Sequence, residues 1–437
     1  MEQIKIGKIK KLRGEFYAPA DKSISQRAVL IGAIAKGVSC IHNFLDADDT
    51  RGAIGAFARM NVKMKLSRIR RENILEIHGR NLYGLRQPKN KIFLGNSGTT
   101  MRLICGILAA QKFSCELCGD DSLNQRPMKR IVEPLSLMGA EISGRKIKRE
   151  IYAPLKIAGH NLKGISYKLP LQSAQVKSAL LLAGLYAKGK TCVYEKLKTR
   201  DHTERMLKAF GADIKEAGLG ITVRGQKELI SPKTLWIPGD LSSALFFIVA
   251  AIILPGSKIL IRNLGLNPTR SYILKVLKRM GADIEFIRTG KNDFGFEPVA
   301  DIKVRSSRLR ATTLSSSEAA YCIDELPAFF VAACFAKGIT RVYNASELRV
   351  KETDRIFSMI TNLKLMGADI ANKKDAVIIK GTACLSRAQV ESFGDHRTAM
   401  SMVVAASAAS GKTIIKDTGC INKSFPDFMK VFNKLAF

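Results

Sequence analysis

The sequence of 437 residues contains few of the features that mark secreted, membrane or disordered proteins. Its basic start, MEQIKIGKIKKLRGEF, lacks the continuous apolar stretch of a signal peptide, so export is not expected. The longest apolar run, from Ala244 to Leu254, is much shorter than the roughly 20 residues that cross a bilayer, and it predicts a buried helix. No Ser, Gln or Pro tract marks a disordered region. We therefore expect a compact cytoplasmic protein that does not contact a membrane.

Acidic residues are also scarce, because 38 Asp and Glu stand against 71 Lys and Arg and give a formal net charge of +33. Such an imbalance creates a surface field that attracts anions. An RNA-binding motif, a long basic tail and aromatic residues interleaved with the basic ones are all missing from the sequence. A basic, solvated surface without nucleic-acid binding is therefore favoured, and a basic nucleic-acid-binding repeat protein stays open as an alternative.

The nine cysteines are an odd number in a chain without an export signal, which indicates reduced thiols rather than a disulfide framework. Cys115 and Cys118 form a lone CxxC pair that has no second pair or neighbouring histidine. Packing within a strand is favoured over a metal or redox site, so no metal is expected.

Internal repetition is the most informative pattern. Six apolar stretches share one register, and five of them end at the glycine that commonly follows a helix. Strand-like segments such as VSCIHN, KTCVYE and ITRVYN follow them. Counting back fifteen positions from the six ends gives the helix starts, which are Lys22, Gly98, Ala174, Leu241, Ile323 and His396.

A second class of helix is amphipathic and ends in MGA, FGA or a related motif, at Met60, Met138, Phe210, Met280 and Met366. Each repeat therefore contains a nearly apolar inner helix, a strand, an outer helix and further strands, which is an α/β pattern. The length favours two domains of roughly 200 residues, although a single sixfold solenoid also fits the repeats.

The polar starts of the six inner helices carry more chemistry than capping requires, since serine or aspartate would suffice as a cap. Helix N-termini bind anions through free backbone N–H groups. Arginine and lysine beside them suit a substrate with carboxylate and phosphate groups, and nearby carboxylates could act as acid or base. If the starts converge they form one cationic pocket; the simpler alternative is six ordinary caps with solvated charges.

Taken together and in order, the motifs resemble those of the 3-phosphoshikimate 1-carboxyvinyltransferases, also called EPSP synthases. They are DKSISQR, LGNSGTTMR, SLNQRPM, SAQVK, RDHTE, PGDLSSA, NPTR, EPVADI, IDELP, ELRVKETDRI, FGDHRTAM and KSFPDF. The resemblance implies two domains, each of three βαβαββ units with pseudo-threefold symmetry. One would span residues 19–239 and the other residues 1–18 with 240–437, joined by crossovers at Glu15–Asp21 and Pro238–Ser242.

The resemblance also implies the ligands of two substrates, bound in the cleft between the domains. Those implied for shikimate 3-phosphate are Lys22, Ser23, Arg27, Ser173, Ala174, Gln175, Arg200, Asp324 and Lys351. Those implied for phosphoenolpyruvate are Lys22, Gly98, Arg126, Gln175, Arg355, Arg397 and Lys423. Arg355 and Arg397 suit its carboxylate, and the proton-transfer candidates are Lys22, Asp324 and Glu352.

The implied reaction is an addition followed by an elimination, in which the 5-hydroxyl attacks C2 as C3 gains a proton and phosphate then leaves. It needs no cofactor. A monomer is expected, with the two small molecules as its partners. Three positions depart from the family pattern, namely Ala20, Gln26 and Leu103, and none of them removes a charged ligand.

The related transferase that acts on UDP-N-acetylglucosamine is the nearest alternative. That enzyme typically has asparagine after its first lysine, whereas Ser23 follows Lys22 here. Within the EPSP synthases, the chain resembles the less glyphosate-sensitive class through RDHTE, SAQVK and NPT, and imperfectly through ADKS. Reduced sensitivity to glyphosate is therefore expected.

Overall fold

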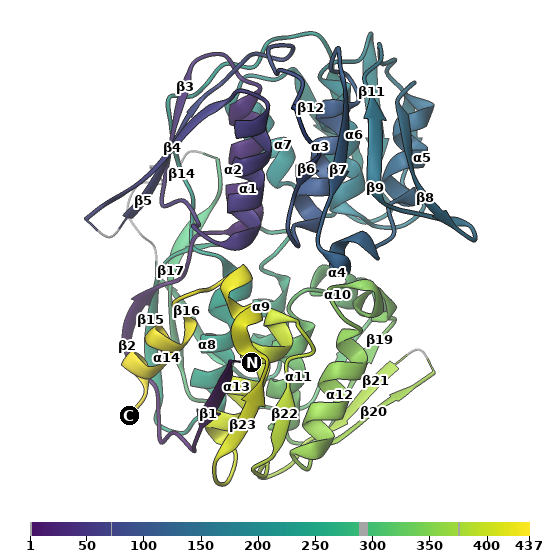
Figure 1. The fold of residues 1–437 in the computed structure, drawn as a ribbon. Coiled ribbons are helices and arrows are strands. Elements are labelled where there is room, and N and C mark those ends of the chain that lie inside the picture. Colours follow the sequence, from purple (N-terminus) through teal and green to yellow (C-terminus); the bar gives the residue numbers. More distant parts are fainter. Residues whose placement is uncertain (1, 71, 288–295, 375) are drawn as a thin grey trace. The chain divides into compact units, whose positions relative to one another are not determined.

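A computed structural model describes residues 2–70, 72–287, 296–374 and 376–437 of the chain. Its contacts separate two units. The inserted unit consists of Ala20–Ile237 together with Phe296 and Glu297, and the terminal unit contains the other described residues, on both sides of that insertion. Figure 1 labels most of the elements of both units. None of the helices in the described chain has the length and apolar character needed to cross a membrane.

The inserted unit contains three copies of one arrangement among its described residues. Each has an inner helix, a central strand, an outer helix and a hairpin. The inner helices are α1 (Lys22–Ala33), α3 (Gly98–Leu108) and α6 (Ala174–Gly184). The outer helices are α2 (Asp48–Arg59), α5 (Lys129–Leu137) and α7 (His202–Ala209), and α4 (Asp121–Asn124) is a short addition.

The described strands of this unit form three four-stranded sheets with one topology. In each sheet a short edge strand runs parallel to the central strand, and the hairpin completes the sheet with antiparallel pairs. The orders are β14-β3-β5-β4, β6-β7-β9-β8 and β10-β11-β13-β12. Their bounds are β3 Val38–His42, β4 Lys63–Ile69, β5 Glu72–His78, β6 Ile92–Phe93, β7 Ser114–Cys118, β8 Glu141–Ile147, β9 Glu150–Ala158, β10 Ser166–Lys168, β11 Lys190–Tyr194, β12 Ile214–Ala217, β13 Gly220–Arg224 and β14 Thr234–Trp236.

The terminal unit follows the same plan. Its inner helices are α8 (Leu241–Ile253), α11 (Leu326–Cys334) and α13 (His396–Ala408). The other helices are α9 (Tyr272–Arg279), α10 (Ser316–Tyr321), α12 (Arg355–Leu365) and α14 (Phe428–Leu435), with 3-10 turns η1 (Ser346–Val350) and η2 (Thr418–Lys423).

Two of the sheets described in the terminal unit have four strands, ordered β16-β17-β15-β2 and β18-β19-β21-β20, while the third, β1-β23-β22, has three. In this last sheet β1 pairs antiparallel with the central strand β23. It has the position next to the central strand that a strand of the hairpin has in the other sheets. The strand bounds are β1 Gln3–Ile6, β2 Arg13–Tyr17, β15 Lys258–Gly265, β16 Asp283–Ile287, β17 Val299–Arg305, β18 Thr313–Leu314, β19 Ile339–Tyr343, β20 Asp369–Lys373, β21 Ala376–Lys380, β22 Gln389–Glu391 and β23 Thr413–Lys416.

Two edge strands belong to one unit while the inner helix that follows each of them in the chain belongs to the other. Strand β2 precedes α1 of the inserted unit but pairs with β15 of the terminal unit. Strand β14 precedes α8 of the terminal unit but pairs with β3 of the inserted unit. The chain therefore changes unit between an edge strand and an inner helix both times. The family-based prediction of six βαβαββ repeats in two groups of three is confirmed.

The inner helices are apolar because they are buried all round. Every residue from Leu241 to Ile252 of α8 is buried, as the run Ala244–Leu254 predicted. In the inserted unit α3 and α6 approach closely at Gly106, where an added Cβ would lie 2.2 Å from the backbone oxygen of Ala179. Glycine is required here by the close backbone approach, rather than by an unusual backbone angle.

The predicted helix starts are confirmed for α1, α3, α6, α8 and α13. The prediction of Ile323 for the remaining inner helix is wrong, because α11 begins at Leu326. Helix α10 continues to Tyr321 just before it, and Pro327 fixes the first turn of α11. The five outer helices each end one residue before the predicted Met or Phe.

The CxxC pair belongs to β7, as strand packing predicted. Cys115 and Cys118 are both free thiols, and burial raises the pKa of Cys115 to about 12. A thiol with so high a pKa is a poor nucleophile at neutral pH.

Candidate active site

The inner helices begin with side-chain caps. Asp21, Ser97, Ser173, Asp240 and Asp395 each accept a hydrogen bond from a backbone N–H in the following first turn. The exception among the described inner helices is α11, whose N-cap residue Glu325 makes no side-chain cap bond. Ser173, a predicted substrate ligand, therefore uses an oxygen lone pair in capping, and its hydroxyl proton can still be donated.

In the terminal unit Asp324 lies beside three cations. Its Oδ1 is 3.7 Å from Nζ of Lys351 and 3.4 Å from a terminal guanidinium nitrogen of Arg355, and its backbone oxygen accepts a 2.6 Å hydrogen bond from Arg397. The Asp324 side chain remains 17% exposed. Four residues from three separate segments thus form one charged group just before the start of α11.

Arg355 is the buried centre of this group. Its Nε donates to Oδ2 of Asp395 at 2.7 Å, and Glu352 lies 4.0 Å from a terminal nitrogen. Burial alone would lower the pKa of Arg355, but the carboxylates of Asp395, Glu352 and Asp324 outweigh burial and raise it. The guanidinium therefore stays charged and available for a carboxylate ligand.

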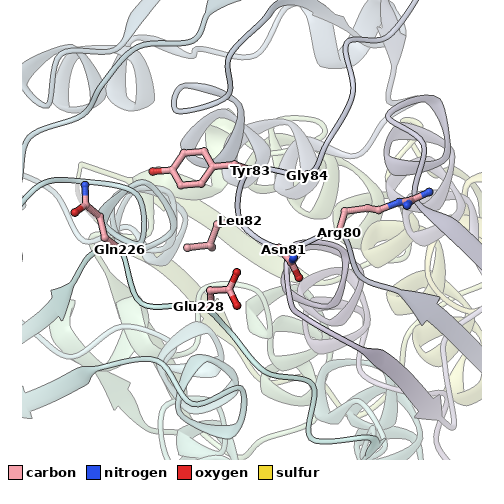
Figure 2. Close-up of a pocket in the computed structure, with 7 residues that line it drawn as sticks. All are labelled: Arg80, Asn81, Leu82, Tyr83, Gly84, Gln226 and Glu228. Carbon is pink, nitrogen blue, oxygen red and sulfur yellow. The ribbon is translucent and has the colours of Figure 1, made fainter.

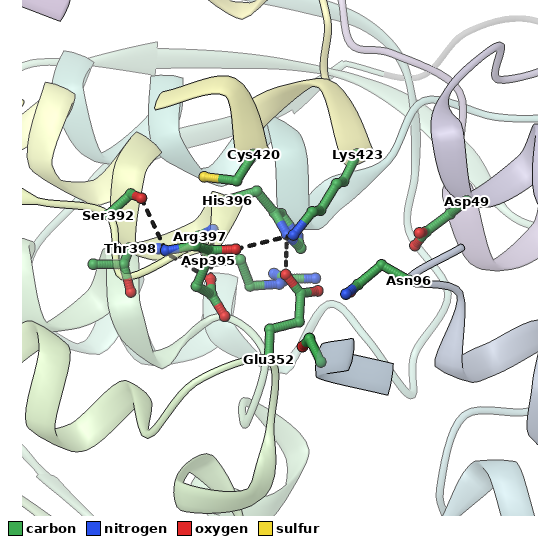
Figure 3. Close-up of polar contacts among 12 residues, drawn as sticks. Asp49, Asn96, Glu352, Ser392, Asp395, His396, Arg397, Thr398, Cys420 and Lys423 are labelled. Atoms are coloured by element: carbon green, nitrogen blue, oxygen red, sulfur yellow. Dashed lines mark hydrogen bonds and ion pairs between the residues drawn. The ribbon is translucent and has the colours of Figure 1, made fainter. Parts of the chain in front are cut away.

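Figure 3 shows Glu352, Asp395, His396 and Arg397 together at the start of α13, with Lys423 nearby. Glu352 Oε2 is 3.0 Å from Nδ1 of His396, and Lys423 donates to the Gly394 backbone oxygen at 3.0 Å. The imidazole fixes the orientation of Glu352, which is a predicted proton-transfer residue.

Ligand atoms of Glu352, Asp395 and His396 lie within 4.8 Å of one another, as in a metal site. The oxygens of Asp395, however, already accept hydrogen bonds from Arg355 and from the first turn of α13. Because this donor set is taken by a guanidinium and by backbone N–H groups, we assign the cluster to side-chain positioning rather than to a metal.

In the inserted unit Lys22, the first residue of α1, forms an ion pair with Asp49. The two atoms are 2.9 Å apart and both side chains are more than four-fifths buried. Asp49 lies in the first turn of α2, where a negative charge is favourable. This acid holds the ammonium group at the helix start.

Gly98, the first residue of α3, lies between two guanidinium groups. A Cβ added to Gly98 would lie 3.1 Å from a terminal nitrogen of Arg102 and 3.1 Å from one of Arg126. Arg126 is held by Asn96, whose backbone and side-chain oxygens both accept from it. The absence of a side chain at Gly98 therefore leaves both cations open to an anion at the helix start.

The start of α6 is joined to α3 by Gln175. Its Oε1 accepts a 3.0 Å hydrogen bond from Arg102, and its Nε2 donates to Oγ1 of Thr99 at 3.0 Å. Ala174, the residue before it, begins the helix. Gln175 thus orients a cation without neutralising it.

Arg27 is only 3% exposed and connects three helices of the inserted unit. It donates to Thr203 of α7 at 2.7 Å, to Ser178 of α6 at 3.2 Å and to the Ser23 backbone oxygen at 2.9 Å. Ser23 is half-buried on α1, and Arg200 is half-buried just before α7.

Two predicted loops contain helical turns. SLNQRPM begins within α4, and ELRVKETDRI runs from η1 to the start of α12. In the terminal unit the structure brings together Asp324, Lys351, Glu352, Arg355 and Arg397, with Lys423 hydrogen-bonded to Gly394 beside the start of α13. In the inserted unit it brings together Gly98, Arg126 and, through Arg102, Gln175.

Several partners were not among the predicted site residues, and Asp49, Asp395 and His396 are the ones that pair with a predicted proton-transfer residue or with Arg355. Asp395 and His396 belong to a recognised helix start, and their polarity was the available signal. Asp49 is one of two acids at the start of an outer helix, and nothing in the sequence indicates its distance from Lys22.

A hollow of about 530 Å³ in the inserted unit, shown in Figure 2, is lined by Arg80, Asn81, Leu82, Tyr83, Gly84, Gln226 and Glu228. Its lining follows the C-terminal ends of two inner helices, since Arg80 N–H donates to Ala33 and Gln226 N–H donates to Leu185. It therefore lies at the opposite end of those helices from the polar starts, and it includes none of the predicted ligands.

A model of EPSP synthase (3-phosphoshikimate 1-carboxyvinyltransferase) matches residues 6–432. The 3-phosphoshikimate 1-carboxyvinyltransferase of Geobacter metallireducens is 47% identical over 436 residues, covering 100% of both chains. That of Syntrophomonas wolfei is 48% identical over 429 residues, covering 98% of each.

Among solved structures, the EPSP synthase of Acinetobacter baumannii superimposes with a TM-score of 0.87 and 41% sequence identity. The match covers 100% of this chain and 98% of that structure. Fold and sequence therefore agree over the whole length.

Proposed function

Because this chain belongs to the EPSP synthase family, it transfers the enolpyruvyl group of phosphoenolpyruvate to the 5-hydroxyl of shikimate 3-phosphate, and we propose that the helix starts of its two units bind these substrates. The observation that carries the proposal is the family match over residues 6–432, a range that contains all six inner helix starts. The product belongs to the biosynthesis of aromatic amino acids.

The proposed ligands of shikimate 3-phosphate are mainly in the inserted unit, with Asp324 and Lys351 from the terminal unit. The remaining ones are Lys22, Ser23, Arg27, Ser173, Ala174, Gln175 and Arg200. The cations and the helix start at Ala174 suit a phosphate, which accepts several hydrogen bonds and carries nearly two negative charges.

Phosphoenolpyruvate is assigned to Lys22, Gly98, Arg126, Gln175, Arg355, Arg397 and Lys423. Arg355 stays charged despite its burial, and Arg397 is fixed by the Asp324 backbone, so together they can hold the carboxylate bidentately. Arg126, beside the open start at Gly98, suits the phosphate.

The reaction requires two proton transfers at carbon and one at oxygen. In the addition, the 5-hydroxyl oxygen bonds to C2 and loses its proton while C3 gains one. In the elimination, C3 loses a proton and the C2–O bond to phosphate breaks. Lys22, Asp324 and Glu352 are the candidate donors and acceptors for these steps.

The two domains, residues 19–239 and residues 1–18 with 240–437, are proposed to close over the substrates. Closure would exclude water and strengthen the charges that stabilise the tetrahedral intermediate. We also propose a cytoplasmic monomer that does not bind nucleic acid, in spite of the charge of +33. Size-exclusion chromatography and filter binding with unrelated RNA at physiological salt would test these two properties.

Phosphate release from phosphoenolpyruvate, measured by a coupled assay, tests the activity directly. Shikimate 3-phosphate should support release, and UDP-N-acetylglucosamine at the same concentration should not. If UDP-N-acetylglucosamine supports phosphate release and shikimate 3-phosphate does not, the chain has the activity of the related transferase instead.

A further inference from the structure

Lys177 of the inserted unit has a completely buried side chain, which is rare for a lysine unless it is paired. It lies on the first turn of α6, shortly after Ser173 and Gln175. Its Nζ is 2.9 Å from Oε2 of Glu195 and 2.6 Å from Oε1 of Glu204. Both carboxylates are themselves at most 1% exposed, so one ammonium group serves two buried acids.

The two acids belong to different elements around the loop that carries Arg200. Glu195 follows β11, and Glu204 lies on α7. The other oxygen of Glu195 accepts hydrogen bonds from the backbone N–H and the hydroxyl of Thr199, while Lys177 also donates to the Thr199 backbone oxygen at 3.4 Å. The loop from Glu195 to Thr199 is thus closed on itself and attached to the first turn of α6.

This cluster is not explained by stability. Burying an ion pair often stabilises a fold less than apolar residues of similar volume would. Burial raises the pKa of Glu204 although the nearby Lys177 ammonium opposes the shift, as expected for a carboxylate removed from water. A fold that needed only packing here could have used methionine or leucine.

We propose that Lys177 is a positioning residue, which fixes Arg200 relative to Ser173 and Gln175 so that the three can bind shikimate 3-phosphate together. Lys177 is too deeply buried to touch the substrate. It acts through Thr199, the residue before Arg200, and through the helix turn that carries the other two ligands. This inference rests on the proposed function, because it takes the assignment of those three ligands from it.

The test compares a double variant, Lys177→Met/Glu204→Met, with wild type. This variant removes the ammonium group and one of the two acids, and it leaves the buried Glu195 carboxylate with its hydrogen bonds to Thr199 but without a cation. We therefore expect a melting temperature below that of wild type, a KM for shikimate 3-phosphate raised about tenfold, and both kcat and the KM for phosphoenolpyruvate changed less than threefold.

A matched control is Gly144→Ala, whose added Cβ would lie 2.6 Å from the Tyr152 backbone oxygen in the β8–β9 hairpin, on elements that carry no residue of the Lys177 cluster. It should lower stability and leave the KM for shikimate 3-phosphate unchanged. If the double variant folds and keeps a normal KM, or if it loses only stability as the control does, Lys177 has no positioning role.

A milder variant, Thr199→Ala, decides the question if the double variant does not fold. It removes the hydroxyl that donates a hydrogen bond to Glu195, and it should raise the KM for shikimate 3-phosphate about threefold. An unchanged KM would overturn the proposal. Wild-type enzyme that fails to use shikimate 3-phosphate at all would instead contradict the proposed function, so the two failures are distinguishable.

Discussion

The arginines at the helix starts of the two units have different hydrogen-bond partners. In the terminal unit Arg355 faces the carboxylates of Asp324 and Asp395. In the inserted unit Arg102 and Arg126 are held by the neutral amide oxygens of Gln175 and Asn96. A carboxylate beside a cation can take part in proton transfer, whereas an amide oxygen orients a guanidinium group toward an anionic ligand without adding a charge of its own. Lys22 of the inserted unit departs from this pattern, because it pairs with the carboxylate of Asp49, so the contrast concerns these arginines.

The largest expected effect comes from removing the carboxylate of Asp324 in the terminal unit. Asp324→Ala should lower kcat by about 10²-fold or more, the usual scale for a lost proton-transfer group, and Asp324→Asn, which keeps the shape, should do the same. Lys22→Met should have an effect of similar size, because Lys22 is the proton-transfer candidate of the inserted unit. Steady-state kinetics measures both, and near-normal turnover in the alanine and methionine variants would remove the assignment.

A smaller effect is expected from removing the side-chain amide of Gln175 in the inserted unit. Gln175→Leu removes hydrogen bonds to Arg102 and Thr99, each worth about 1 kcal/mol, so the KM values of both substrates should rise by up to about thirtyfold while kcat changes little. Gln111→Leu is the matched control, since this glutamine is buried in the same unit but bonds to Leu82 and Ile107 backbone oxygens. A larger change in the control would show that Gln175 acts through folding.

Packing gives the next test, since α3 and α6 of the inserted unit meet through Gly106 whereas α8 of the terminal unit packs with phenylalanines such as Phe247 against Phe16 and Phe428. Gly106→Ala should reduce the free energy of unfolding by about 1–3 kcal/mol. Gly55→Ala on the exposed face of α2 should instead raise it by up to about 1 kcal/mol, because the added Cβ meets no described atom within 4 Å. Urea unfolding measures both, and equal effects would refute the packing argument.

Rising salt is expected to lower kcat/KM by a few-fold. If the cations of the helix starts and the net charge of +33 speed the capture of anions, rising salt lowers kcat/KM more than kcat. At physiological ionic strength screening already limits the field to about 8 Å. A flat salt profile for both parameters would leave the high charge as surface composition alone.

The smallest effect concerns glyphosate, which is longer than phosphoenolpyruvate. Leu103 stands where many family members have proline and can shift the start of α3, so we expect glyphosate to bind the wild-type enzyme no more tightly than phosphoenolpyruvate. Gly98→Ala should weaken glyphosate further, since its Cβ would lie 3.1 Å from nitrogens of Arg102 and Arg126. Competition kinetics against phosphoenolpyruvate would test this, and much tighter binding of glyphosate would contradict the expectation.

Much of the fold could be predicted because its repeats depend on local signals. Buried inner helices are apolar on every side, and outer helices end in a glycine motif, so five of six inner starts were found from spacing alone. Ile323 was wrong because the fifteen-residue spacing takes no account of Pro327, which belongs to the first turn of α11. Spacing cannot show that a preceding helix, α10, occupies the polar segment before it.

The contacts of the candidate site could not be predicted in the same way. Lys22 and Asp49 are 27 residues apart, and Glu352 and His396 are 44 apart, with no periodic pattern joining either pair. Such pairs depend on how helices pack, and packing is decided by the whole core. The buried position of Lys177 was hidden for the same reason, since a lysine on a helix is expected at the surface.

The exchange of β2 and β14 between units has a consequence for how the chain is made. Apart from Phe296 and Glu297, the inserted unit is one continuous stretch, so its sheets are complete once Ile237 has left the ribosome. The terminal unit must wait much longer, because β1 pairs with β23 and Leu12 bridges to Ala436. During synthesis the first nineteen residues therefore have no sheet to join while the inserted unit folds behind them. The four lysines of this segment are residues of the kind that disfavours pairing of an open strand edge with other chains.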